Sequence, residues 1–296
     1  MEEYIKNIMN KSKKVSVILP NYNYEKYLSR RIKSILSQTY PLYELIILDD
    51  ASSDNSVKKI KSLLPKIKEK YPNLKVKFLV NEKNTGKPIK QWQKGFELAT
   101  GNYIWIAEAD DLSSRRFLEE MMKPFSDEKV VLSYSESKII NKFGVILAPN
   151  FRFSRDKEKT GRYQKSYIKD GKKEIEEIMA IRCSIPNVSA VVFYNTPKIP
   201  YQKYLEEASS FSQAGDWYFY SKVLNHGKIS YNKKSLNSFR VHHGSRTAES
   251  KKLETSYREI LKLHQSFLEN YHLSEVVKKW MKAEEMRIKL KYGIIS

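Results

Sequence analysis

Cysteine is nearly absent from this chain, in which Cys183 is the only one among 296 residues. One thiol can form no intrachain disulfide and cannot supply the several thiolates of a structural zinc site, so a reducing cytosol fits best. No stretch approaches the roughly 18 uninterrupted apolar residues that a membrane-spanning helix needs. The opening residues, Met1 to Lys6, lack the apolar core of a secretory signal, so we expect no signal peptide.

Two glycine signatures of nucleotide-binding proteins are missing as well. None of the 10 glycines forms the G-x-G-x-x-G pattern that follows the first strand of nicotinamide-dependent oxidoreductases, and Pro20-Asn21-Tyr22 stands at that turn. Gly86-Lys87 is followed by Pro88 and not by serine or threonine, so there is no phosphate-binding P-loop. These absences argue against an oxidoreductase and against a P-loop enzyme.

Negative charge is in deficit, because 54 Lys and Arg outnumber 34 Asp and Glu and give a formal net charge of +20. Such a chain suits a polyanionic partner, which can be nucleic acid, an anionic bilayer surface or a phosphorylated substrate. It also suits a lysine-rich composition spread over solvated faces, since the lysines form no long basic block. The charge alone leaves both interpretations open.

Strand-like and helix-like patterns alternate over the first half of the chain. Apolar runs predict strands, and apolar residues at three- and four-residue spacing predict helices between them. The expected strands are 15–19, 44–49, 76–80 and 103–107, and the helices include 28–36, 57–67, 87–99 and 117–122. This alternation indicates an α/β fold with a mostly parallel sheet flanked by helices. Further on we expect strands at 130–134 and 188–194, a polar loop over the site at 151–173, and helical structure over 249–292.

Acidic clusters end two of these strands. Asp49-Asp50 follows the second strand, and Glu108-Ala109-Asp110-Asp111 follows the fourth. The carboxyl ends of parallel strands line the ligand crevice, where clustered carboxylates are costly without a cation or hydrogen-bond donors. A divalent metal and a nucleotide ribose would supply that compensation. The pattern therefore points toward a nucleotide-sugar enzyme.

The second cluster holds three carboxylates within four residues, which suits a hard cation such as Mg²⁺ or Mn²⁺ acting on a diphosphate leaving group. The alternative is that Asp110 or Asp111 only caps the next helix. After the first strand, Tyr22 could stack on a base while Asp50 accepts a hydrogen bond from the base or the ribose. The alternative there is an ordinary strand-to-helix turn.

Several motifs follow one another in the order and spacing of a known family. They are Val15-Ser-Val-Ile-Leu-Pro-Asn-Tyr-Asn, Ser34-Ile-Leu-Ser-Gln-Thr-Tyr-Pro, Glu44-Leu-Ile-Ile-Leu-Asp-Asp-Ala-Ser-Ser-Asp, Asn84-Thr-Gly-Lys and Glu108-Ala-Asp-Asp. With them the chain closely resembles the family 2 glycosyltransferases of the GT-A fold over residues 15 to about 135, and more loosely to about 246. The resemblance implies a Rossmann-like GT-A catalytic domain over 15–246, after an N-terminal arm at 1–14 and before a C-terminal helical extension at 247–296. Within the domain, 15–135 would bind the nucleotide sugar and 136–246 the acceptor.

The resemblance also implies roles for single residues. Asp50, Pro20 and Tyr22 would hold the nucleobase, and Lys87 belongs with them among the nucleotide-binding residues. Asp110 would be the direct metal ligand. Asp111 beside it and the later His242 would approach the metal or the diphosphate, although the alternative for His242 is a solvated side chain.

Two further carboxylates receive roles from the same resemblance. Glu108 would contact the nucleotide, and it departs from the family's usual aspartate by one methylene, which moves the carboxylate by roughly one bond length. Asp216, in Gly215-Asp216-Trp217, would be the general base that accepts a proton from the acceptor hydroxyl. We expect the aromatic residues after it to form the wall of a sugar site. The alternative is a helix N-cap beside a core aromatic stripe.

Taken together, the resemblance implies a metal-dependent inverting glycosyltransferase that uses Mn²⁺ or Mg²⁺ and a nucleotide-diphosphate sugar, most simply a UDP-sugar. Its acceptor would be a sugar, glycolipid or polysaccharide of the bacterial surface, reached at the cytosolic membrane face. The basic C-terminal helices would either rest on an anionic leaflet or pack on the domain. The rival is a non-catalytic α/β protein that binds nucleic acid or another polyanion, but acidic strand ends would repel phosphates.

Overall fold

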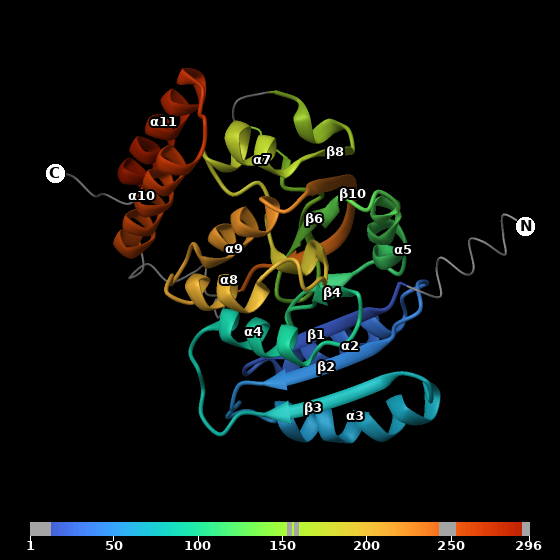
Figure 1. Cartoon of the computed structure of the whole chain (residues 1–296). Helices are drawn as coiled ribbons and strands as arrows, with labels where there is room; N and C mark the ends of the chain where they lie inside the picture. Colours follow the sequence, from blue (N-terminus) through green and yellow to red (C-terminus); the bar gives the residue numbers. More distant parts are fainter. Residues whose placement is uncertain (1–12, 153–155, 157–159, 243–252, 292–296) are drawn as a thin grey trace, which may run out of the picture.

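A single mixed sheet organises the chain, and helices cover both of its faces (Figure 1). The structure is a computed structural model that describes residues 13–152, 156, 160–242 and 253–291. Within these residues the sheet has the strand order β3-β2-β1-β4-β9-β6-β10-β5, with β7 paired to β6 and β8 to β10. The arm expected at 1–14 therefore lies almost wholly outside the described residues, as do both ends of the helical stretch expected at 249–292.

The first half is the alternating parallel arrangement that the sequence predicts. Each strand pairs in parallel with its neighbour, and helices connect the strands. The elements are β1 (Val15–Asn21), α2 (Glu25–Leu36), β2 (Glu44–Asp49), α3 (Ser56–Lys70), β3 (Lys75–Val80), α4 (Pro88–Leu98) and β4 (Tyr103–Ile106). The α/β prediction is thus confirmed, with boundaries close to those expected.

β1 runs further than expected, through Pro20 to Asn21. A proline has no N–H to give to a strand partner. On the β4 side the pairing stops at Ile18, opposite Ile106, so no hydrogen bond to β4 is lost at Pro20. On the β2 side the pairing continues until Asn21 lies opposite Asp49, which brings the ends of both strands to one edge.

The second half is mixed and less regular. β6 and β10 are long and parallel, whereas β9 lies antiparallel between β4 and β6. The elements are β5 (Leu112–Ser113), α5 (Phe117–Met122), β6 (Val130–Ile140), β7 (Ile146–Ala148), β8 (Tyr167–Asp170), α7 (Gly171–Glu174), β9 (Val191–Tyr194), α8 (Tyr201–Ala208), α9 (Gly215–Leu224) and β10 (Lys228–Arg240). Short 3₁₀ or π turns occupy Lys123–Ser126, Arg162–Gln164, Ile175–Met179 and Val188–Ala190.

Two expectations about this half are wrong. The loop expected at 151–173 contains a 3₁₀ turn, the strand β8 and the start of α7, and β8 pairs antiparallel with β10. The strand expected from Val188 begins only at Val191, because a short turn precedes it. A strand as short as β8 shows little pattern of its own, and its hydrogen bonds come from a partner far along the chain.

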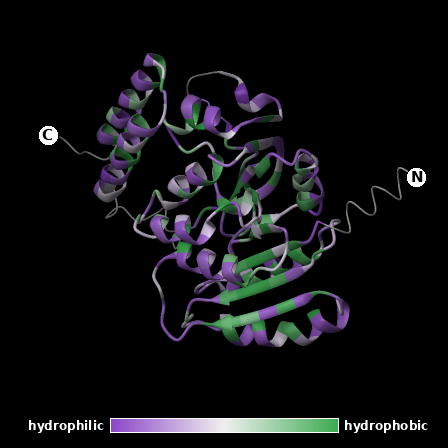
Figure 2. Ribbon diagram, viewed as in Figure 1, coloured by the Kyte–Doolittle hydropathy of each residue, from purple (hydrophilic) through white to green (hydrophobic). Residues whose placement is uncertain are grey.

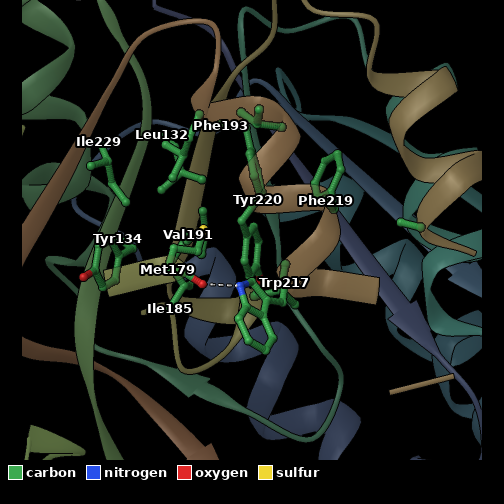
Figure 3. Packing of buried hydrophobic residues seen from close by; sticks show 14 of the residues in the cluster. Leu132, Tyr134, Met179, Ile185, Val191, Phe193, Trp217, Phe219, Tyr220 and Ile229 are labelled. Atoms are coloured by element: carbon green, nitrogen blue, oxygen red, sulfur yellow. Dashed lines mark hydrogen bonds between the residues drawn. The ribbon is translucent and has the colours of Figure 1, made fainter. Parts of the chain in front are cut away.

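Two hydrophobic cores, one on each face of the sheet, hold these elements together. Val15, Val17 and Leu19 of β1 belong to the core under α2, α3 and α5, while Ile18 belongs to the core under α4, α8 and α9. Because β1 is buried on both faces, its sequence is an almost continuous apolar run, as a central parallel strand requires. Figure 2 shows β1 and β2 as mostly hydrophobic ribbon, and Figure 3 shows part of the core under α9.

The C-terminal extension consists of two helices joined by a short turn, α10 (Leu253–Asn270) and α11 (Glu275–Lys291). Leu263, Phe267, Val277 and Met281 are almost fully buried and belong to the core under α9. The extension therefore packs on the rest of the chain, which is one of the two arrangements expected for it. None of the helices in the described part of the chain has both the length and the apolar content that a bilayer crossing requires.

Candidate active site

A cavity of about 310 Å³ opens at the edge of the sheet where β4 and β10 end. Five residues expected at the site line it together, namely Lys87, Glu108, Asp110, Asp111 and Asp216. They come from the start of α4, the segment after β4 and the start of α9, which are far apart in the sequence. The described residues between β7 and α7 are not among those that line this cavity, and the position of the 151–173 segment over the site stays a prediction.

Glu108 is held at the cavity wall by two polar contacts. Its Oε1 accepts a hydrogen bond from Trp92 Nε1 at 2.6 Å, and its N–H donates to Ser189 Oγ at 3.2 Å. Burial raises the pKa of Glu108 to about 8, and the charge of Asp110 raises it as well, while the bond from Trp92 opposes them. The longer side chain at this position thus reaches a partner on α4.

Asp111 is the most buried carboxylate of the cluster and is 3% exposed. Its Oδ1 accepts the N–H of Arg240 at 2.9 Å, and its Oδ2 accepts Asn187 Nδ2 at 3.4 Å. Burial and then the charge of Asp110 raise the pKa of Asp111 to about 7, whereas Arg31 lowers it. Both oxygens therefore help to join the segment after β4 to the end of β10.

Asp110 faces His242 at the same edge. His242 Nε2 lies 3.0 Å from Asp110 Oδ2, with side chains that are 8% and 16% exposed respectively. The rings of Tyr24 and Tyr27 flank the imidazole, with centroids 5.6 and 5.4 Å away. His242 is therefore not the solvated side chain of the alternative interpretation.

The chemistry of this edge fits a divalent cation in part. The carboxylates of Glu108, Asp110 and Asp111 are oxygen donors of the kind that Mg²⁺ and Mn²⁺ prefer, and burial together with the charge of Asp110 raises the pKa values of Glu108 and Asp111. However, no group of three or more His, Cys, Asp or Glu is gathered to hold a metal ion among the described residues. The metal roles of Asp110, Asp111 and His242 stay predictions.

A buried arginine that the sequence analysis did not single out is coupled to this cluster. Arg31 of α2 is fully buried, its Nη1 donates to Ser113 Oγ at 2.8 Å, and its guanidinium lies 5.2 Å from the Trp105 ring. Burial lowers the pKa of Arg31 to about 10, and the carboxylates of Asp111, Asp110 and Glu108 oppose this. The sequence held a signal, because Arg31 interrupts the apolar stripe of α2, where a charge needs a partner.

Asp216 lies on another wall of the cavity as the second residue of α9. Its Oδ1 accepts the N–H of Trp217 at 2.7 Å, and burial raises the pKa of Asp216 to about 6 against the effect of nearby backbone N–H groups. Figure 3 shows Trp217, whose Nε1 donates to the carbonyl of Met179 at 2.8 Å, among buried rings that include Phe219 and Tyr220. These rings belong to the core, so the expected sugar-site wall after Asp216 is wrong.

Asp50 is buried immediately after β2, and its carboxylate fixes the loop that leads to α4 by hydrogen bonds. It accepts hydrogen bonds from Asn81 Nδ2 at 2.7 Å, Thr85 N–H at 3.0 Å, Thr85 Oγ1 at 2.7 Å and Gln91 Nε2 at 2.9 Å. The protein thus uses both of its oxygens, and Asp50 is not part of the cavity wall.

The other nucleotide-binding candidates are divided between the cavity and its surroundings. Pro20 is buried in β1, and Tyr22 is 44% exposed, and neither lines the cavity. Lys87 does line it, immediately before α4, and its Nζ donates to the carbonyl of Ser209 at 2.7 Å. The base-binding roles of Pro20, Tyr22 and Asp50 stay predictions.

Two solved structures share this architecture over 94% of the chain. Staphylococcus aureus TarS, residues 1–349 in complex with UDP, has a TM-score of 0.59 at 20% identity, and the match covers 70% of it. The mannosyltransferase PcManGT of Pyrobaculum calidifontis, in complex with GDP-Man and Mn²⁺, has a TM-score of 0.59 at 17% identity, again over 70% of its length. The fold is therefore that of the GT-A glycosyltransferases, as expected.

Residues 16–183 match the model of glycosyl transferase family 2, and because this is more than half of the chain, the protein belongs to that family. An uncharacterised glycosyltransferase of Nostoc sp. is 36% identical over 119 residues, which are 40% of this chain and 34% of that protein. Staphylococcus aureus TarP, a poly(ribitol-phosphate) beta-N-acetylglucosaminyltransferase, is 37% identical over 135 residues, which are 45% of this chain and 37% of TarP. The aligned parts thus span about a third of the length of these relatives.

Proposed function

We propose that this protein transfers a sugar from a nucleotide-diphosphate sugar to an acceptor hydroxyl, with inversion at the anomeric carbon. The observation that carries the proposal is the cavity, in which the acidic cluster of Glu108, Asp110 and Asp111 shares one space with Asp216. Membership of glycosyl transferase family 2 supports it. Neither that membership nor the structural neighbours support the alternative, a non-catalytic protein that binds nucleic acid or another polyanion.

Single-step inversion needs a base on one side of the anomeric carbon and a stabilised leaving group on the other. Asp216 would accept the proton of the acceptor hydroxyl. With a pKa raised to about 6 it is a stronger base than an exposed aspartate, yet it is mostly ionised at pH 7. The acceptor oxygen bonds to the anomeric carbon as the bond to the diphosphate oxygen breaks, and the nucleoside diphosphate leaves toward the acidic cluster.

The acidic cluster would serve the diphosphate end of the donor. Asp110, with Asp111 and His242, would hold Mn²⁺ or Mg²⁺, and Mn²⁺ in the mannosyltransferase neighbour supports this choice. When bound, such a cation supplies Lewis-acid neutralisation of the diphosphate charge. Glu108 and Lys87, which line the same cavity, would contact the nucleotide part of the donor.

The base of the nucleotide would lie at the ends of β1 and β2. There the exposed ring of Tyr22 can stack on a base, beside Pro20, and Asp50 can accept a base N–H. Because Asp50 also accepts bonds from Asn81 and Thr85, the bound base must share the carboxylate with them or displace them. A UDP-sugar is the donor we propose, since TarS was solved with UDP and with UDP-GlcNAc.

The acceptor we propose is a sugar, glycolipid or polysaccharide of the bacterial surface. TarP is named for poly(ribitol-phosphate), and Escherichia coli WfgD, 30% identical over 132 residues, is named for alpha-D-GlcNAc-diphosphoundecaprenol. We place the protein in the cytoplasm, peripherally at the inner membrane face. One face of α11 supports this, because Val276, Trp280 and Leu290 are exposed there and Lys279 and Lys282 are also exposed on α11.

In this proposal the chain divides by role. Residues 15–135 bind the nucleotide sugar, and residues 136–246 bind the acceptor. The C-terminal extension, 247–296, supports the second part, because α10 and α11 contribute side chains to the core under α9.

A panel of nucleotide sugars, assayed for donor hydrolysis with Mn²⁺, with Mg²⁺ and with EDTA, tests the proposal. We expect at least one donor, most simply a UDP-sugar, to be hydrolysed only in the presence of a metal ion. The same panel with Asp110→Ala is the comparison, and turnover there should be lower by about three orders of magnitude. A salt-dependent shift of a labelled oligonucleotide, without hydrolysis of any donor, would favour the polyanion-binding alternative instead.

A further inference from the structure

The loop that precedes α9 forms one wall of the candidate cavity. Ser209, Phe211, Ser212 and Gln213 line the cavity, and the loop then runs directly into α9, which carries Asp216. The N–H groups of residues 209–211 bond to carbonyls of α8, but those of Ser212, Gln213 and Ala214 need acceptors from elsewhere in the molecule. These acceptors therefore determine how rigidly this wall of the cavity is held.

The acceptors come from the C-terminal extension. The carboxylate of Glu259 on α10 accepts the N–H of Ser212 at 2.5 Å, of Gln213 at 2.8 Å and of Ala214 at 3.0 Å. Three successive N–H groups that converge on one anion form a compact anion-binding concavity. Hydrogen bonds of this type to a charged acceptor are roughly twice as strong as neutral ones.

α10 also contacts the first turn of α9 and the loop itself through side chains. The ring of Trp217, the residue after Asp216, lies 5.7 Å from the His264 ring and 6.0 Å from the Phe267 ring. Lys262 Nζ lies 5.1 Å from the centre of the Phe211 ring. α10 therefore contacts the chain on both sides of Asp216, at Phe211 in the loop before it and at Trp217 after it. Its location near α9 in Figure 1 agrees with these contacts.

We propose that Glu259 is a positioning residue for the acceptor side of the site, which it serves by holding the 209–214 loop and, through it, the carboxylate of Asp216. This inference rests on the proposed function only for the role of Asp216. Glu259 and the loop both lie outside residues 16–183, the part that matches the family model. The described part of the extension thus supports the cavity wall, although none of its side chains is among those that line the cavity.

Two variants and one control test the proposal in the full-length protein. Glu259→Ala removes the carboxylate, and Glu259→Gln keeps one acceptor oxygen but adds an N–H₂ group that faces donors. The control is Glu254→Ala on the same helix, because Glu254 pairs only with Arg258 at the exposed surface among the described contacts. Thermal melting of all three reports how much of any effect is general stability.

Amide hydrogen exchange of residues 209–216 is the first measurement. In Glu259→Ala we expect exchange at Ser212, Gln213 and Ala214 to rise by at least about tenfold, because the three N–H groups lose their acceptor. Glu254→Ala should leave it unchanged. Unchanged exchange in Glu259→Ala would overturn the proposal, and this result does not depend on any enzymatic activity.

Steady-state kinetics are the second measurement. We expect kcat of Glu259→Ala to fall by about tenfold or more, because a base displaced by a fraction of an ångström loses alignment, while KM for the donor stays within about twofold. Added acetate or formate should restore part of kcat in Glu259→Ala and none in Glu259→Gln. A fall that tracks thermal stability, with no rescue, would reduce Glu259 to a structural contact and overturn the role. If the wild type turns over no donor, the proposed function fails, and the exchange measurement still decides whether Glu259 holds the loop.

Discussion

The acidic cluster and Asp216 share one cavity, but the surroundings that raise carboxyl pKa values differ between the two. Glu108 and Asp111 have pKa values raised to about 8 and about 7 by burial and by the neighbouring charge of Asp110. Asp216 has a pKa raised to about 6 by burial, and only backbone N–H groups oppose this. Crowded carboxylates of the first kind call for a cation, whereas a separate carboxyl of the second kind can exchange a proton near neutral pH. The same chemical group thus suits two tasks according to its neighbours.

The largest effect should come from the cluster. Asp110→Ala removes the carboxylate that we assign to the metal, and turnover should fall by about three orders of magnitude while the protein stays folded. Donor hydrolysis and a far-ultraviolet circular dichroism spectrum check this. The control is Glu128→Ala, an exposed carboxylate before β6. Full activity of Asp110→Ala, or of the wild type in excess EDTA, would contradict the metal role of Asp110. It would also contradict the proposed difference in task between the acidic cluster and Asp216.

Asp216→Asn should lower turnover by about two to four orders of magnitude, because the acceptor hydroxyl loses its base. The same change should not weaken the fold. A pKa that is raised on folding means that the folded state disfavours the ionised carboxyl at neutral pH, so its removal should raise Tm by about 1–4 °C. Melting curves and turnover of one protein preparation test both statements. A lower Tm together with normal turnover would make Asp216 a structural residue.

The pH profile sharpens the same comparison. The base acts only when ionised, so kcat of the wild type should fall about tenfold for each pH unit below about 6, the value to which the pKa of Asp216 is raised. The residual rate of Asp216→Asn should lack this acidic limb. An identical limb in the variant would assign the ionisation to a different group.

A smaller effect is expected at the end of β2. If Asp50 accepts a hydrogen bond from the base, Asp50→Asn should weaken binding of the free nucleoside diphosphate by about 1–3 kcal/mol in calorimetry. Thr85→Val is the informative control, because it removes only the loop hydroxyl that now donates to Asp50. Equal losses in both variants would mean that Asp50 acts by ordering the loop, and unchanged affinity in Asp50→Asn would remove it from the base site.

The smallest effect concerns the outer face of α11. Replacing Val276 and Trp280 by serine should reduce co-sedimentation with anionic vesicles by a few fold, and Lys279→Glu should reduce it further, since a well-placed cation contributes about 1 kcal/mol near such a surface. Leu268→Ser on α10 is the matched control, because Leu268 is also exposed. Equal pelleting with neutral and anionic vesicles would contradict the membrane proposal and leave the extension with its packing role alone.

Much of the first half could be predicted because its signals are local. The apolar run from Val15 to Leu19 and the acidic residues that close β2 and β4 each report on their own stretch of chain, and the crossover rules for parallel strands then bring those ends to one edge. The second half resisted prediction where partners are distant. β8 is short and depends on β10, and the aromatic run after Asp216 looks the same whether it lines a sugar site or fills a core.

By itself the sequence determined the alternating α/β order, the family and the carboxylates that line the cavity, because motifs and hydrophobic periodicity are properties of neighbouring residues. Only the tertiary structure decided that Arg31 is the buried cation coupled to the acidic cluster, that Trp92 holds Glu108, and that Glu259 holds the loop before Asp216. A helical stretch can show that a charge needs a partner, as the apolar stripe around Arg31 does, but it does not identify that partner. The role of each of these residues follows from long-range packing, which places charged and polar groups where little water is present and their hydrogen bonds and charge interactions are stronger.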